Sequence, residues 1–61
     1  MANLTTKELS ALEDQMGQEQ ILVKKYQTFA AQCQDPTLKN KCSEYASKHQ
    51  AHFNTLLGYL N

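Results

Sequence analysis

The feature that most constrains the fold of this 61-residue chain is the spacing of its apolar residues on either side of its one proline, Pro36. Before Pro36, a stripe recurs at alternating intervals of three and four residues: Leu9, Leu12, Met16, Glu19, Val23, Tyr26, Ala30 and Cys33. A second such stripe follows it: Leu38, Cys42, Tyr45, His49, His52, Leu56 and Tyr59. This heptad spacing predicts two helices that pack along nearly parallel axes.

Local signals indicate where the two helices begin. Thr5 and Glu8 form the Thr-x-x-Glu pattern of a capping box. Asp35 is a favoured N-cap residue, and Pro36 suits the first position of a helix. We therefore predict one domain, residues 1–61, with helices over about 6–34 and about 36–59. Because the connection is so short, the helices should be antiparallel neighbours.

The apolar faces are wider than one facing helix can cover. Further apolar residues flank both stripes: Leu22, Phe29, Ala46, Phe53, Leu57 and Leu60. A chain this short also buries too little surface to be very stable alone. The sequence therefore predicts an all-α fold, an antiparallel two-helix hairpin that forms a homodimer and so a four-helix bundle.

Composition and charge exclude several classes of function. Six lysines balance six acidic residues and arginine is missing, which argues against nucleic acid as a partner. No apolar run approaches the ~20 residues that span a bilayer. The start, Met1 to Leu4, lacks the basic and apolar regions of a secretory signal, so we expect a cytoplasmic protein with reduced thiols. Without a paired nucleophile and base or a Gly-rich phosphate loop, we do not expect an enzyme.

Three polar residues, Glu19, His49 and His52, interrupt the apolar stripes. Counted from the turn between Asp35 and Pro36, Glu19 and His52 are equally far away, so an antiparallel hairpin places them at the same height. His49 is three residues from His52 and therefore shares its helix face. We predict that the three side chains converge.

A carboxylate on an apolar stripe is costly unless it is paired or bound to a metal. In one interpretation, Glu19 and a histidine form a buried hydrogen-bonded pair that the Tyr26 and Tyr45 hydroxyls help to satisfy. In another, Glu19, His49 and His52 bind a divalent metal, because one carboxylate with two imidazoles suits zinc, iron or manganese. In a third, the helices are rotated and these groups lie in solvent at the rim. The sequence leaves the three interpretations open.

Cys33 and Cys42 both lie on the stripes near the turn. They are offset by four residues in height, or ~6 Å along the helix axis. A disulfide between them within one hairpin would be strained, because its Cα atoms usually lie within ~7 Å. We interpret them as two buried thiols.

The spacing Glu19-x6-Tyr26 resembles the first helix of ferritin-like proteins, and Tyr45 to Phe53 is similar to a rubrerythrin-like second helix. The resemblance covers half of a ferritin-like fold, which a dimer would complete. It implies that Glu19 is a metal carboxylate, that Tyr26 lies near the metal, and that His52 is the histidine of a Glu-x-x-His motif. His49 departs from that motif, since it replaces a bridging carboxylate. This departure favours one zinc-like ion, or none, over oxygen chemistry.

The chain also resembles small proteins of the spore coat protein F group, through Gln34-Asp35-Pro36 and then Lys48-His49-Gln50-Ala51-His52-Phe53. That resemblance implies a structural protein in or near the spore coat, with other coat proteins as partners. Three hypotheses follow: a structural homodimer with an internal Glu-His layer, a metal-binding half-ferritin dimer, and an interaction module that offers its apolar face to another helical protein.

Overall fold

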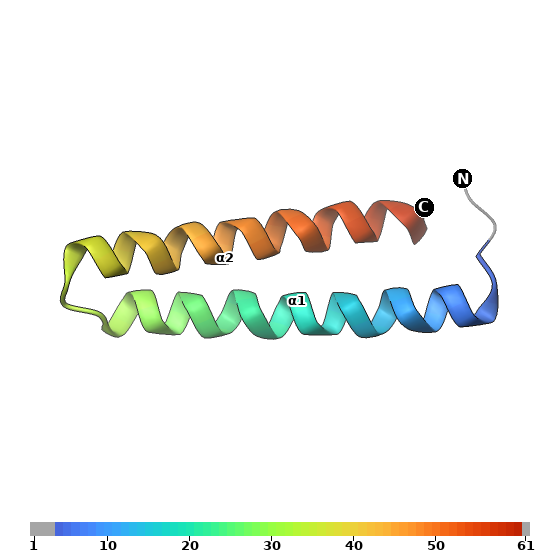
Figure 1. Ribbon diagram of the computed structural model, residues 1–61, viewed down its shortest axis with the longest axis horizontal. Helices are drawn as coiled ribbons and strands as arrows, with labels where there is room; N and C mark the ends of the chain where they lie inside the picture. The colour runs from blue at the N-terminus through green and yellow to red at the C-terminus, as the bar shows by residue number, and fades with distance from the viewer. Residues whose placement is uncertain (1–3, 61) are drawn as a thin grey trace.

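The structure is a computed structural model that describes residues 4–60, and it is an antiparallel hairpin of two helices (Figure 1). Helix α1 spans Thr6–Gln32 and helix α2 spans Pro36–Leu57, followed by a short 3-10 helix, η1, over Gly58–Leu60. Residues 1–3 and 61, which the predicted domain included, lie outside the described residues. The part of the chain that is described has no strand. The predicted all-α hairpin is confirmed.

Both predicted helix starts are present. The Thr5 side chain accepts a hydrogen bond from the Glu8 N–H at 3.1 Å, and the Glu8 carboxylate accepts one from the Thr5 N–H at 2.9 Å. The Asp35 carboxylate caps α2 by accepting hydrogen bonds from two backbone N–H groups, of Thr37 at 2.9 Å and Leu38 at 3.2 Å. These caps satisfy N–H groups that have no partner within their helix. The starts of both helices are therefore fixed by local contacts.

The helix ends differ from the prediction by about two residues. Helix α1 ends at Gln32 rather than near Gln34, because Cys33 is already extended. Asp35 is extended as well, as expected for a residue that precedes proline. Helix α2 ends at Leu57, and the tighter turn of η1 continues the chain past residue 59. Between residues 4 and 60, neither helix is long and apolar enough to cross a membrane.

The contact between α1 and α2 forms a small core. Its buried apolar side chains are short or of medium size: Val23, Ala30, Cys42 and Ala46. None of the large apolar side chains in the described range is fully buried, and several are 37–61% exposed. Small domains with so little buried surface are only marginally stable alone.

The line of α2 that faces α1 is rotated from the predicted stripe. It runs along side chains that are buried or half-buried: Cys42, Ala46, His49, Phe53 and Leu56. Tyr45 and His52, which the stripe placed inside, are both exposed in the hairpin. The physical reason is that two helices alone bury one narrow strip of each other, and the small Ala46 side chain lets α2 turn this side inward. The stripe prediction was therefore wrong for Leu38, Tyr45, His52 and Tyr59, which are all exposed within one hairpin.

Candidate metal centre

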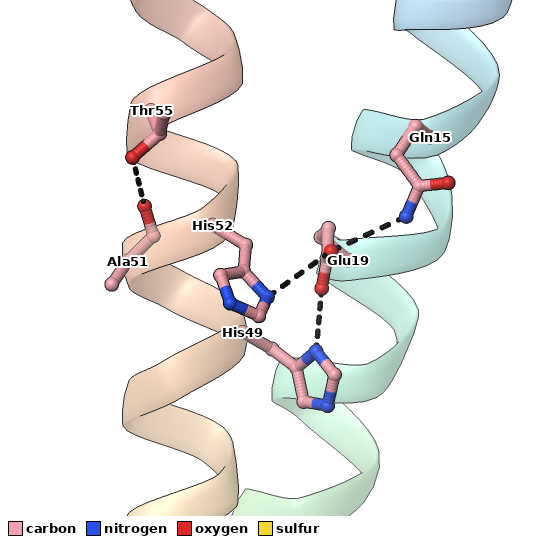
Figure 2. Close-up of polar contacts among 6 residues, drawn as sticks. All are labelled: Gln15, Glu19, His49, Ala51, His52 and Thr55. Carbon is pink, nitrogen blue, oxygen red and sulfur yellow. Dashed lines mark hydrogen bonds and ion pairs between the residues drawn. The ribbon is translucent and has the colours of Figure 1, made fainter.

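Glu19 is the only acidic residue among the described residues that the core buries. It is the central residue of the 27-residue helix α1, its exposed fraction is 6%, and its side chain points towards α2 (Figure 2). A carboxylate in this position requires polar partners, because burial without them is costly. Its partners come from both helices.

His49 on α2 is the closest partner of Glu19. The His49 Nδ1 atom lies 2.5 Å from Glu19 Oε1. Because an ionised carboxylate can only accept hydrogen bonds, His49 donates its Nδ1–H. The Tyr26 ring stacks on the His49 ring, with centroids 5.9 Å apart and planes within 2°. Tyr26 thereby fixes the orientation of the imidazole.

The second Glu19 oxygen has two weaker partners. His52 Nδ1 lies 3.4 Å from Glu19 Oε2, and the Gln15 side chain donates a hydrogen bond to the same oxygen at 3.2 Å. The two imidazole rings meet edge to face, with centroids 5.7 Å apart. His52 is the open member of the group, since its side chain is 60% exposed against 25% for His49. No buried side-chain polar atom in the described part of the chain lacks a partner.

The structure brings together all three residues that the sequence singled out. The same count of residues from the turn places Tyr26 level with Tyr45, and their ring centroids lie 5.4 Å apart. The hydrogen-bonded pair of Glu19 and a histidine in the first interpretation is present, with His49 as the partner. Its expected help from tyrosine hydroxyls is not seen among the described residues, where Tyr26 contributes its ring face and Gln15 makes the further polar contact. Sequence reasoning missed Gln15, although its spacing of four residues from Glu19 was a signal. The third interpretation, in which these groups lie in solvent at the rim, holds only for the side chain of His52.

The surroundings of Glu19 favour its charged form. The pKa of Glu19 lies below its usual value, chiefly because His49 donates a hydrogen bond to the carboxylate. Burial raises the pKa, while the Gln15 hydrogen bond and the charges of His49 and His52 lower it further. Desolvation is thus outweighed by the polar partners. An ionised carboxylate beside two imidazoles is a suitable ligand set for a cation.

The donor set fits a divalent metal ion. One ligand atom each from Glu19, His49 and His52 can be chosen so that all lie within 4.8 Å of one another. A zinc ion binds histidine nitrogen and carboxylate oxygen at about 2.0–2.2 Å, so two ligands of a tetrahedral zinc ion lie about 3.5 Å apart. Small side-chain movements would bring all three groups onto one ion. Binding would displace the proton that His49 shares with Glu19.

No family model, curated protein or solved structure matches this chain. The resemblances to ferritin-like proteins and to the spore coat protein F group therefore stay predictions. What the chain can do has to be inferred from its own residues.

The two cysteines are not part of this group. Cys42 is buried and Cys33 is half-buried, and both thiols are free. The Cys33 thiol donates a weak hydrogen bond to the Asp35 carbonyl oxygen at 3.6 Å. The interpretation of these residues as two thiols rather than a disulfide is confirmed, although only Cys42 is buried.

We expect the Glu19 contacts to make the metal-free protein sensitive to acid. Since the folded-state pKa of Glu19 is lowered, its contribution to stability is present above the unfolded-state value, near 4.5, and is lost as the pH falls through the lower folded-state value. Thermal melts in the presence of a chelator should therefore show the Tm of the native protein falling more steeply below about pH 4.5 than the Tm of Glu19→Gln. Other shifted groups, such as Glu8, are common to both proteins and cancel. Curves of Tm against pH that run parallel for the native protein and Glu19→Gln would contradict this role of Glu19.

Proposed function

We propose that this protein binds a divalent metal ion through Glu19, His49 and His52. The observation that carries the proposal is the convergence of three ligand atoms within 4.8 Å around a buried carboxylate. One carboxylate and two neutral imidazoles leave a net charge of +1 on the bound ion, which suits zinc and also iron or manganese. The role we propose is binding, and no reaction is assigned to it.

The proposal includes assembly into a homodimeric four-helix bundle. Its support is the small core of the single hairpin, together with large apolar side chains that are exposed in it. Four-helix bundles build metal sites in their interior from side chains on facing helices. A dimer would therefore bury both the apolar surface and the open side of the metal centre.

A structural protein, of the kind found in spore coats and with other coat proteins as partners, is the second candidate. The observation that favours it is that side chains of the chain itself, His49, His52 and Gln15, serve as polar partners of the Glu19 carboxylate. In this candidate the group is an internal polar layer, and such layers can fix how helices pair.

Metal analysis and thermal melts separate the two candidates. We expect protein purified without a histidine tag to retain zinc, iron or manganese, and chelated protein to gain stability when the ion is restored. At an ion concentration of 100 times Kd, the gain is about 2.7 kcal/mol, or a rise in Tm of roughly 10–20 °C for a chain of this size.

The matched control is Cys33→Ser, which should respond to zinc like the native protein, because this thiol is remote from the proposed ligands. Less than about 0.2 ion per chain, together with an unchanged Tm, would contradict metal binding and leave the structural candidate.

A further inference from the structure

Four of the eight large apolar side chains that are exposed among the described residues, including all three aromatic ones, lie on one broad side of the hairpin, which we call the aromatic face. Its members are Leu22, Phe29, Leu38, Tyr45 and Tyr59. Leu22 is half-buried, and the exposed fractions of the others are 55% for Phe29, 54% for Leu38, 42% for Tyr45 and 53% for Tyr59. So much exposed apolar and aromatic side chain on a small helical protein is typical of an interaction surface.

Residue spacing and contacts show that these residues share one side. Leu38, Tyr45, His52 and Tyr59 are seven residues apart and form one line along α2, while Gln15, Leu22 and Phe29 form one along α1. Three neighbouring pairs place the α2 line beside this side of α1: Tyr26 with Tyr45, Glu19 with His52, and Gln15 with Tyr59, which line one surface depression.

The opposite broad side is polar. A shallow groove there is lined mainly by small and amide side chains, including Gln27, Ser43, Ser47, Gln50 and Asn54. The two broad sides of the hairpin therefore differ, because the aromatic face carries the exposed aromatic side chains and the groove on the other side is mainly polar.

The candidate metal centre opens onto the aromatic face. His52 lies in the line of Tyr45 and Tyr59, and its exposed side chain is the part of the centre that this face presents. Three protein ligands leave at least one position of a tetrahedral ion unfilled. We expect that position to be filled from the aromatic face, because α1 and α2 lie on either side of the group (Figure 2) and the exposed His52 belongs to this face.

We propose that a second copy of this chain covers the aromatic face and closes the metal centre, a step that rests on the proposed metal binding. Glu19 is the central residue of α1. Two copies can pair about a two-fold axis parallel to the helices or about one perpendicular to them at the middle of the hairpin. In both cases Glu19 of one copy lies at the same height as Glu19 of the other. Either symmetric pairing therefore places His52 of one copy level with the Glu19, His49 and His52 group of the other.

The size of the face supports a second copy as the occupant. The broad side of the hairpin measures 46 by 16 Å between Cα atoms, or roughly 740 Å², close to the ~800 Å² per partner of a standard interface. The small core described above leaves the hairpin marginal on its own, and pairing through this face would give it a larger one. An unrelated partner would instead have to supply its own ligand at the level of His52.

The test compares Phe29→Glu on the aromatic face with Gln27→Glu on the polar side. Both add a negative charge to the same stretch of α1, at residues that are exposed in the hairpin and are not metal ligands. Sedimentation gives the mass, and zinc titration gives the affinity. We expect the native protein and Gln27→Glu to be dimers with equal affinity, and Phe29→Glu to be a monomer that binds zinc at least about tenfold more weakly.

A dimeric Phe29→Glu, or a monomeric one with unchanged zinc affinity, would overturn the inference. A native monomer that binds zinc would overturn the inference and the proposed dimer while leaving the proposed metal binding intact. A native dimer that takes no zinc would contradict the metal binding itself. Should Phe29→Glu fail to fold, the native protein decides, because the Tm of a dimer rises with protein concentration. A Tm of the native protein that does not change with protein concentration would also overturn the inference.

Discussion

Replacing His49 with alanine will lower the Tm of the metal-free protein by at least about 4–8 °C, and by more than replacing His52 with alanine. His49 approaches the buried Glu19 carboxylate to 2.5 Å and stacks on Tyr26, whereas His52 is 3.4 Å away and mostly exposed. Removing one partner of a buried pair is costly, because the charge that remains is left without compensation. His49→Ala also removes the ring that packs on Tyr26.

The measurement is a thermal melt at neutral pH with a chelator present. Gln50→Ala is a suitable control, since Gln50 neighbours His49 in sequence but lines the polar groove on the other side of the hairpin. Equal losses of Tm for His49→Ala and His52→Ala would contradict the account, because the two histidines would then not differ as partners of Glu19.

Replacing Glu19 with leucine will abolish the zinc-dependent rise in Tm while leaving the metal-free protein about as stable as before. Leucine fills a similar volume, and exchanging a buried ionic group for a well-packed apolar one is often neutral or stabilising. His49 can then become neutral and bond to water, since its side chain is 25% exposed. Zinc affinity should fall by more than about 100-fold, the upper limit for losing a residue that only supports a ligand.

Glu19→Gln is the matched control, because its amide keeps the shape and one acceptor but ligates zinc poorly. We expect Gln and Leu variants to lose zinc alike in titrations of chelated protein. A Glu19→Leu protein that still gains stability with zinc would place the ion elsewhere. One that fails to fold without metal would show that the carboxylate itself is needed for folding.

Much of the fold follows from local chemistry and could therefore be predicted. The Thr5 and Asp35 caps are formed by residues within three positions of each other, so their sequence patterns are sufficient. Once the turn is fixed between Gln32 and Pro36, counting residues gives the height of every side chain. This count therefore predicts that Glu19, His49 and His52 converge, without knowledge of any tertiary contact.

The rotation of α2 could not be predicted in the same way. A heptad pattern marks a broad apolar face, but which line of that face points at α1 depends on the sizes of the side chains that meet. Ala46 rather than Tyr45 turned inward, so His52 lies at the edge of the hairpin instead of inside it. Gln15 was missed for a related reason, since glutamine on a helix surface is common and only the position of Glu19 gives it a role.

Crystals grown with zinc and measured at the zinc absorption edge would test the central claim most directly. The account predicts an anomalous peak in the layer of Glu19, with an oxygen of Glu19 and a nitrogen each of His49 and His52 at about 2.0–2.2 Å from it. Zinc bound only at Cys33, Cys42 or surface acids, with the Glu19–His49 hydrogen bond still in place, would contradict it.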